Sequence, residues 1–292
     1  MTSVRATESE AVLLVDYGSL EAAATLGLRV IAERLGRNLG CDVAPVSLRH
    51  SDAVPAASLG GRAAEVLEPA LEHRAREGVE RFLIIPLFFG PSGALLGDVP
   101  TCVTRVRGRF RRIQVRLAPW LVNATDGTDD RMASIIADQV RAKMIQEDEP
   151  RPAVILVDHG SPERAVTLVR DHLAARLASR LGDSVTGVRA ASMERRPGAE
   201  YDFNEPSLER ALNESDSNAG RVIVAMQFLL AGRHAGPNGD VARICAAARR
   251  RRPGLSITMT ELVGSHPKLI EVLANRAREG WAAAPVFQSG ST

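Results

Sequence analysis

Two histidines and one glutamate, His159, Glu194 and His234, each follow a predicted strand in the second half of the chain. The three predicted strands span residues 153–157, 184–192 and 221–230. In an open parallel sheet, ligands bind beyond the carboxyl ends of the strands. Imidazole nitrogens and carboxylate oxygens are common ligands of divalent first-row metals. The sequence therefore predicts a divalent-metal site at this edge, formed by His159, Glu194 and His234.

The elements that position these residues read as strands alternating with helices. Residues 162–182 have apolar positions three and four apart and end in a glycine, which predicts a helix. The other predicted elements are helices at 205–214, 241–254 and 267–281, and a strand at 255–264. Such alternation is typical of a parallel sheet covered by helices on both faces.

The chain is an internal duplication. Residues 11–40 align without a gap on residues 153–182 and share 16 identities in 30 positions, and a looser match continues beyond them. We therefore predict an α/β protein of two tandem similar domains, at residues 1–146 and 151–286. The junction near residues 145–152 is charged and carries two prolines.

The repeat also pairs the candidate site residues with residues of the first copy. The ungapped match places Tyr17 opposite His159, Asp52 opposite Glu194, and Ala94 opposite His234. Both imidazoles are absent from the first copy. We infer that this copy keeps the frame of the domain and has lost the metal chemistry.

The composition of the chain and the absence of several common motifs argue against a number of protein classes. Three cysteines are scattered without a CxxC pair, which argues against a disulfide framework or an iron–sulfur cluster and favours the cytoplasm. There is no apolar run of membrane-spanning length, so we expect no membrane segment. The chain lacks the GxSxG, P-loop and GxGxxG patterns.

The arginines admit two interpretations. Two arginine clusters lie at matching predicted helix ends, where cations complement the helix dipole. A nucleic-acid-binding protein is the alternative, although the net charge is only +2 and no nucleic-acid motif accompanies the clusters. We expect no nucleic-acid partner.

Several motifs together resemble the class II chelatases, the sirohydrochlorin cobaltochelatase and ferrochelatase family. These motifs are VDHGS at 157–161, ME at 193–194 followed by EPSL at 205–208, FLLAGRH at 228–234, and LVGSHPKL at 262–269. The resemblance implies two similar domains facing each other across a cleft. It implies a lyase that inserts Co2+ or Fe2+ into a sirohydrochlorin-type tetrapyrrole without ATP, in cobalamin or siroheme biosynthesis.

The resemblance also assigns roles to residues. It implies that His159 and His234 serve as metal ligand and base, assisted by Glu194. The residues expected to bind the macrocycle are Ser161, Arg195, Tyr201, Arg233 and Tyr17. The sequence leaves the metal open among Co2+, Fe2+ and Ni2+, with no other cofactor, and favours a monomer.

Two features depart from the family pattern. In long two-domain members the histidines are expected in the first half, whereas here they lie in the second. The segment between Glu194 and the EPSL motif is also longer than usual. A non-catalytic carrier of metal or tetrapyrrole is the alternative function, and turnover separates it from an enzyme.

Overall fold

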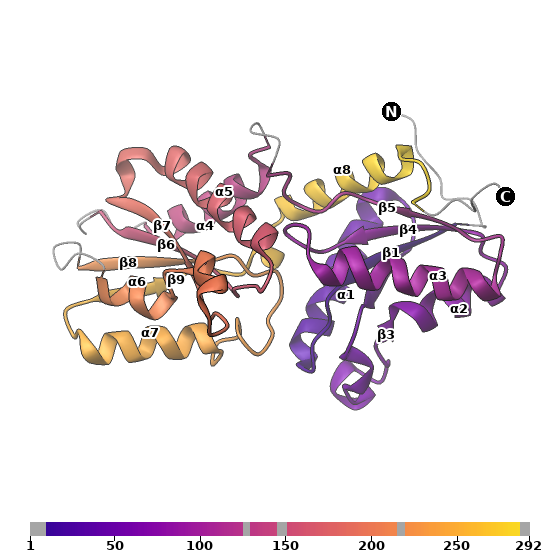
Figure 1. Ribbon diagram of the computed structural model, residues 1–292, viewed down its shortest axis with the longest axis horizontal. Coiled ribbons are helices and arrows are strands. Elements are labelled where there is room, and N and C mark those ends of the chain that lie inside the picture. The colour runs from indigo at the N-terminus through magenta and orange to yellow at the C-terminus, as the bar shows by residue number, and fades with distance from the viewer. Residues whose placement is uncertain (1–9, 125–128, 145–150, 215–219, 287–292) are drawn as a thin grey trace. The chain divides into compact units, whose positions relative to one another are not determined.

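The computed structural model describes residues 10–124, 129–144, 151–214 and 220–286, which form two compact units (Figure 1). The first unit extends to Leu121 and takes up the chain again from Ile270, and the second unit spans Val122–Leu269. Each unit is built on a parallel sheet with helices around it. The α/β fold predicted from the sequence is therefore confirmed. Among the described residues, no helix is long and apolar enough to span a membrane.

The first sheet has the strand order β3-β2-β1-β4-β5, and every pair is parallel. Its strands are β1 (Glu10–Asp16), β2 (Val43–Ser47), β3 (Glu65–Val66), β4 (Arg81–Pro86) and β5 (Gln114–Leu117). The helices of this unit are α1 (Ala22–Leu39), α2 (Leu67–Arg76), α3 (Val99–Arg109) and most of α8 (Lys268–Ala282). The central strands β1 and β4 are buried almost throughout, as expected for strands covered on both faces.

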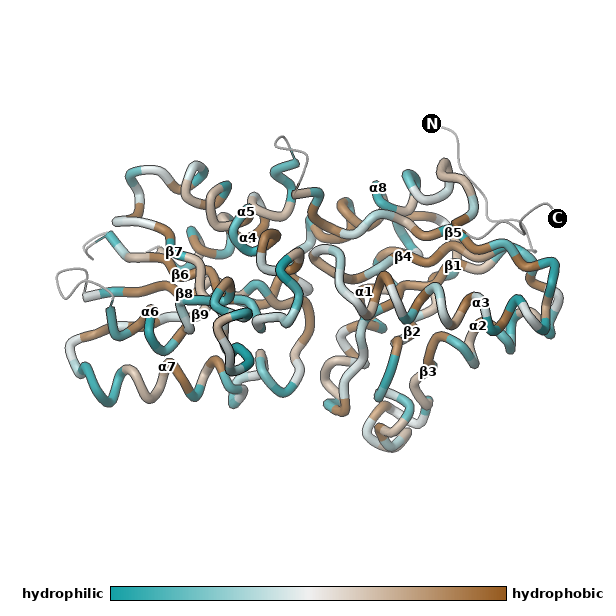
Figure 2. The backbone as a smooth tube through the Cα atoms, in the orientation of Figure 1, coloured by the Kyte–Doolittle hydropathy of each residue, from teal (hydrophilic) through white to brown (hydrophobic). Residues whose placement is uncertain are grey.

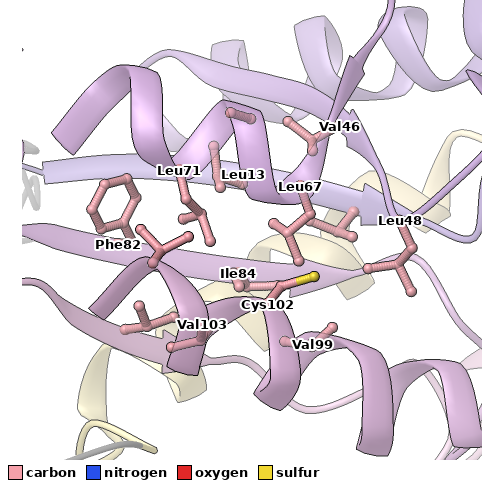
Figure 3. Close-up of a cluster of buried hydrophobic side chains, with 14 of the residues drawn as sticks. Leu13, Val46, Leu48, Leu67, Leu71, Phe82, Ile84, Val99, Cys102 and Val103 are labelled. Carbon is pink, nitrogen blue, oxygen red and sulfur yellow. The ribbon is translucent and has the colours of Figure 1, made fainter. Parts of the chain in front are cut away.

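One face of this sheet packs against α2 and α3 through a single apolar cluster (Figure 3). Leu13 and Ile84 of the strands meet Leu67 and Leu71 of α2 and Val103 of α3. All five side chains are fully buried. Each such side chain contributes about 1.5–3 kcal/mol relative to an exposed one, so this cluster holds the sheet and both helices together.

The second sheet has the order β7-β6-β8-β9, again parallel throughout. Its strands are β6 (Ala153–Asp158), β7 (Gly187–Ser192), β8 (Arg221–Met226) and β9 (Ser256–Met259). Its helices are α4 (Arg131–Ala142), α5 (Arg164–Leu181), α6 (Leu208–Glu214) and α7 (Asp240–Arg251). One face packs on α6 and α7, and α4 lies against α5 on the other side (Figure 1). Hydrophobic residues run along the central strands of both units (Figure 2).

The last helix of each half packs in the unit formed mainly by the other half. Helix α4 belongs to the second unit, and α8 joins the first from Ile270 onward. Gly280 allows α8 to approach closely, because a Cβ there would lie 2.8 Å from side-chain atoms of Leu83 and Ala118. The two compact units therefore do not contain the same segments of the chain as the two copies of the sequence repeat. The limits 1–146 and 151–286 describe the repeat and stay a prediction, and the junction at 147–150 lies outside the described residues.

Candidate metal site

The turn after β6 brings His159 against Glu194. Gly160 has φ +91°, a backbone conformation that residues with a side chain rarely adopt. A Cβ there would also overlap the carbonyl oxygen of Glu194. The backbone N–H of Glu194 donates to the carbonyl of His159 at 3.2 Å. The glycine in the VDHGS motif is therefore needed for the close approach of two strand ends.

The structure brings together the three residues predicted to bind metal. The rings of His159 and His234 have centroids 4.6 Å apart at an interplanar angle of 63°. Nε2 of His159 lies 3.4 Å from Oε1 of Glu194. The side chains of His159, Glu194 and His234 are 48%, 60% and 32% exposed, so the cluster is open to an incoming ligand.

Hydrogen bonds at the two Nδ1 atoms leave the outer ring nitrogens available. Nδ1 of His159 lies 2.9 Å from the carbonyl oxygen of Gly160, and Nδ1 of His234 lies 2.6 Å from Oδ2 of Asp240. Both partners accept hydrogen bonds, so each Nδ1 donates, and a ring that carries its single proton on Nδ1 has its lone pair on Nε2. The lone pair of His159 then faces the Glu194 carboxylate, an arrangement that a cation between them would stabilise.

Asp240, the first residue of α7, completes this cluster and was not predicted from the sequence. Its carboxylate also forms an ion pair with Arg243. The hydrogen bond from His234 and the bond to Arg243 lower the pKa of Asp240, so it is a carboxylate at neutral pH. The available signal was an acidic residue immediately before the helix predicted at 241–254, six positions after His234.

A buried polar network supports the strand ends beneath the histidines. Arg170 of α5 is 2% exposed and donates to the hydroxyl of Ser192 at 2.6 Å. Ser192 in turn donates to Asp158, the residue before His159, at 2.6 Å. Burial raises the pKa of Asp158, while Ser192 and Arg170 act in the opposite direction.

The long segment after Glu194 is tied into the same network. It forms the short 3-10 turn η5 (Ala199–Asn204). Arg170 also donates to the carbonyl of Asn204 at 3.1 Å, and the Asn204 amide donates to the carbonyl of Ser161 at 2.8 Å. Asn204 is 1% exposed, so it holds the segment against the turn that carries His159.

Four residues of the second unit are predicted to bind the macrocycle, and they differ in whether their polar groups are already paired within the protein. Arg195 is engaged by Asp202 at 2.6 Å and Glu205 at 2.9 Å. The hydroxyl of Ser161 accepts from the N–H of Glu163.

Tyr201 and Arg233 are placed differently from these two. The guanidinium of Arg196 lies 5.9 Å from the centre of the Tyr201 ring. Arg233 is exposed, and within the described residues it has no ion-pair partner. The roles of all four residues, and that of Tyr17, stay predictions.

The first unit corrects one pairing of the repeat. The backbone N–H of Arg49 donates to the carbonyl of Tyr17, as that of Glu194 does to His159, and a Cβ on Gly18 would overlap the carbonyl of Arg49. Arg49 is therefore the counterpart of Glu194, and the pairing with Asp52 was wrong. The segment from the end of α5 to the end of β7 contains three more residues than the segment from the end of α1 to the end of β2, and the ungapped match could not account for them.

Tyr17 is 46% exposed, and its ring lies 5.9 Å from that of His50.

Within the described parts of the chain, no group of three or more His, Cys, Asp or Glu is arranged to hold a metal ion. The cluster in the second unit is thus an open pair of imidazoles beside a carboxylate rather than a closed cage. Closed sites with four protein ligands are typical of structural metal ions, whereas sites with an open coordination position are typical of catalytic metal ions.

The arginines at the end of α7 are used within the fold. Arg249 donates to the carbonyl of Ile257, Arg252 to the carbonyl of Leu212, and Arg251 pairs with Glu209 at 3.0 Å. These contacts, together with the helix dipole, give the three arginines a structural role at the end of α7.

Comparisons with known proteins bear on the sequence family and on the fold. Residues 153–280 match the model of the CbiX family. A search of the curated proteins found no match. Among solved structures, SirB from Bacillus subtilis with Fe3+ superposes with a TM-score of 0.70 at 16% identity, covering 93% of this chain and 95% of that one.

Two further structures share the fold. SirB from Bacillus subtilis subspecies spizizenii in complex with cobalt gives a TM-score of 0.68 at 16% identity, over 93% of this chain and 94% of that chain. CbiX, described as the terminal enzyme for biosynthesis of siroheme in denitrifying bacteria, gives 0.58 at 15% identity, over 92% and 98%. Residues 153–280 therefore carry a match to the CbiX family, and the chain as a whole shares the fold of these SirB and CbiX structures.

Proposed function

We propose that this protein is a class II chelatase that inserts Co2+ or Fe2+ into a sirohydrochlorin-type tetrapyrrole without ATP, as a step of siroheme or cobalamin biosynthesis. The observation that carries the proposal is the open cluster of His159, His234 and Glu194 at the strand ends of the second unit. Two imidazoles lie against each other, and one of them adjoins a carboxylate. This is a ligand set for a borderline divalent metal.

Insertion requires the metal to lose water and the macrocycle to lose two pyrrole protons. In our proposal His159 and His234 take the metal from solution and present it to the macrocycle. Glu194 offsets the metal charge while the metal is bound and then accepts one pyrrole proton, and the imidazole nitrogen that the metal leaves accepts the other. The metal is a substrate here, so the site must release it, and an incomplete ligand set suits release better than a closed cage would.

The acidic side chains of such macrocycles require cations at the rim of the site. Arg233 adjoins His234 in sequence, is exposed and is available for a carboxylate. Arg195 is already balanced by Asp202 and Glu205, and it contributes most by shaping the segment that follows Glu194. Ser161, Tyr201 and Tyr17 remain proposed contacts of the macrocycle.

The printed descriptions of the relatives support the same reaction class. One SirB structure contains Fe3+ and another contains cobalt, and that SirB is described as a sirohydrochlorin chelatase. These metals fit the choice that the donor set leaves open. We propose a cytoplasmic location, consistent with three free cysteines, two of them buried, and we propose that the protein acts as a monomer.

The test is an anaerobic absorbance assay with sirohydrochlorin and Co2+, Fe2+ or Ni2+ in turn. We expect the wild type to form many product equivalents per protein, His159→Ala and His234→Ala to be inactive, and Tyr17→Phe to keep most of the activity. A wild-type rate equal to that of metal alone would refute the proposal for this substrate. A single equivalent of product or bound metal per chain would instead indicate a carrier.

A further inference from the structure

We propose that Asp240 is a positioning residue that orients His234 for the metal substrate. The inference rests on the proposed function, since it assigns Asp240 a task only if His234 handles a metal. It adds a fourth residue to the three-residue site. Asp240 would not touch metal or macrocycle, and it would act entirely through the imidazole.

The geometry supports this assignment. Oδ2 of Asp240 accepts from Nδ1 of His234 at 2.6 Å, a short, charge-assisted hydrogen bond. The other carboxylate oxygen is held by Arg243, so the carboxylate cannot turn away from the ring. The ring is therefore fixed both in tautomer and in orientation, with Nε2 as its free lone pair.

The first unit shows what this helix position does without a histidine. Asp98 immediately precedes α3 as Asp240 opens α7, and the ungapped sequence match places Ala94 opposite His234. With no imidazole to hold, Asp98 pairs with Arg49 at 2.6 Å. Both units thus have an aspartate where this helix begins. Its partner is Arg49 in the first unit and His234 in the second.

Histidines that bind metals commonly donate their second ring N–H to a carboxylate, which fixes the tautomer and strengthens the ligand. The competing explanation is that Asp240 merely stabilises the positive end of α7. That explanation predicts a loss of stability and no change in the tautomer or in metal affinity. The two explanations therefore differ in measurable ways.

The first experiment is a long-range 1H–15N correlation spectrum of the imidazoles in the full-length protein at pH 8. The His234 signals are assigned by their loss in His234→Gln. We expect the Nδ1–H tautomer for His234 in the wild type and a shift toward Nε2–H in Asp240→Ala. A wild-type His234 protonated on Nε2 would overturn the inference without any variant.

The second experiment measures Co2+ binding to the same proteins by the visible absorbance of the bound ion. Asp240→Ala should bind Co2+ about 10–100-fold more weakly. Asp240→Glu should recover part of that loss. Asp98→Ala removes the matching aspartate of the first unit and should leave Co2+ affinity unchanged.

Equal weakening in Asp98→Ala and Asp240→Ala, or unchanged affinity in both, would refute the positioning role. Neither measurement requires turnover of a tetrapyrrole. If sirohydrochlorin is not metallated while the tautomer and Co2+ results hold, the proposed function fails and the role of Asp240 stands.

Discussion

Arg49 in the first unit occupies the backbone position that Glu194 occupies in the second. Each donates its N–H to the carbonyl of the residue that follows the first strand of its unit. That residue is Tyr17 in the first unit, at 3.1 Å, and His159 in the second, at 3.2 Å. The same frame therefore carries a cation in one unit and a carboxylate in the other. The duplication has kept the strand ends and reversed the charge at this position.

This reversal gives a prediction for the carboxylate. Glu194→Gln keeps the size of the side chain and removes its charge, so it should lower kcat for metal insertion by about 100-fold or more, as expected for loss of a proton acceptor. Arg49→Gln, at the matching position, should leave Co2+ affinity unchanged. The measurements are steady-state insertion kinetics and Co2+ titration. Equal effects of the two variants on Co2+ affinity would contradict a site confined to the second unit.

The two glycines of the strand-end turns give a second prediction. Gly160→Ala places a Cβ against the Glu194 carbonyl at φ +91°, and Gly18→Ala does the same against Arg49 at φ +94°. Each should destabilise the fold by about 2–4 kcal/mol, from backbone strain and overlap. Urea unfolding measures both losses.

Only Gly160→Ala should also weaken Co2+ binding, since it separates His159 from Glu194. If Gly18→Ala weakened it to the same degree, loss of stability rather than loss of site geometry would explain the effect.

A third prediction concerns Asp16, the counterpart of Asp158. Burial raises the pKa of Asp16 to about 6, and its Oδ1 has no hydrogen-bond partner. Asp158 has Arg170 nearby, whereas α1 presents the apolar Leu28 at the matching position. The Asp16 carboxylate is thus buried without the cation that serves its counterpart.

The sign of the pH dependence follows from this raised pKa. Between pH 3.8 and about 6 the folded state binds the Asp16 proton more tightly than the unfolded chain, so this group costs stability as pH rises through that range. Asp16→Asn removes the charge. It should be about 1–2 kcal/mol more stable than wild type at pH 7 and nearly equal to it near pH 4.

Thermal unfolding at the two pH values measures this difference. Asp158→Asn is the matched comparison, because Arg170 and Ser192 oppose the rise in the pKa of Asp158, and its gain in stability at pH 7 should be smaller than that of Asp16→Asn. A loss of stability in Asp16→Asn that does not vary with pH would contradict the argument.

The sequence by itself determined much of this architecture. Buried parallel strands are short apolar runs, and amphipathic helices have a period of 3.6, so both signals are local. The identities between the two copies fixed the duplication. The ends of the predicted strands then placed His159, Glu194 and His234 at one edge, and the structure brings these three together.

What the sequence did not determine depends on non-local contacts. The pairing of Glu194 with Asp52 failed because three extra residues lie between the end of α5 and the end of β7, and only the hydrogen bonds between strand ends show that Arg49 takes the position. The hydrogen bond between Asp240 and His234 depends on how α7 begins beside the end of β8.

The exchange of α4 and α8 between units was decided only by the tertiary structure. An amphipathic helix carries an apolar face that can be buried against either sheet, and its sequence does not say which one. Close packing makes that choice, as at Gly280, where α8 approaches Leu83 and Ala118 more closely than any side chain would allow.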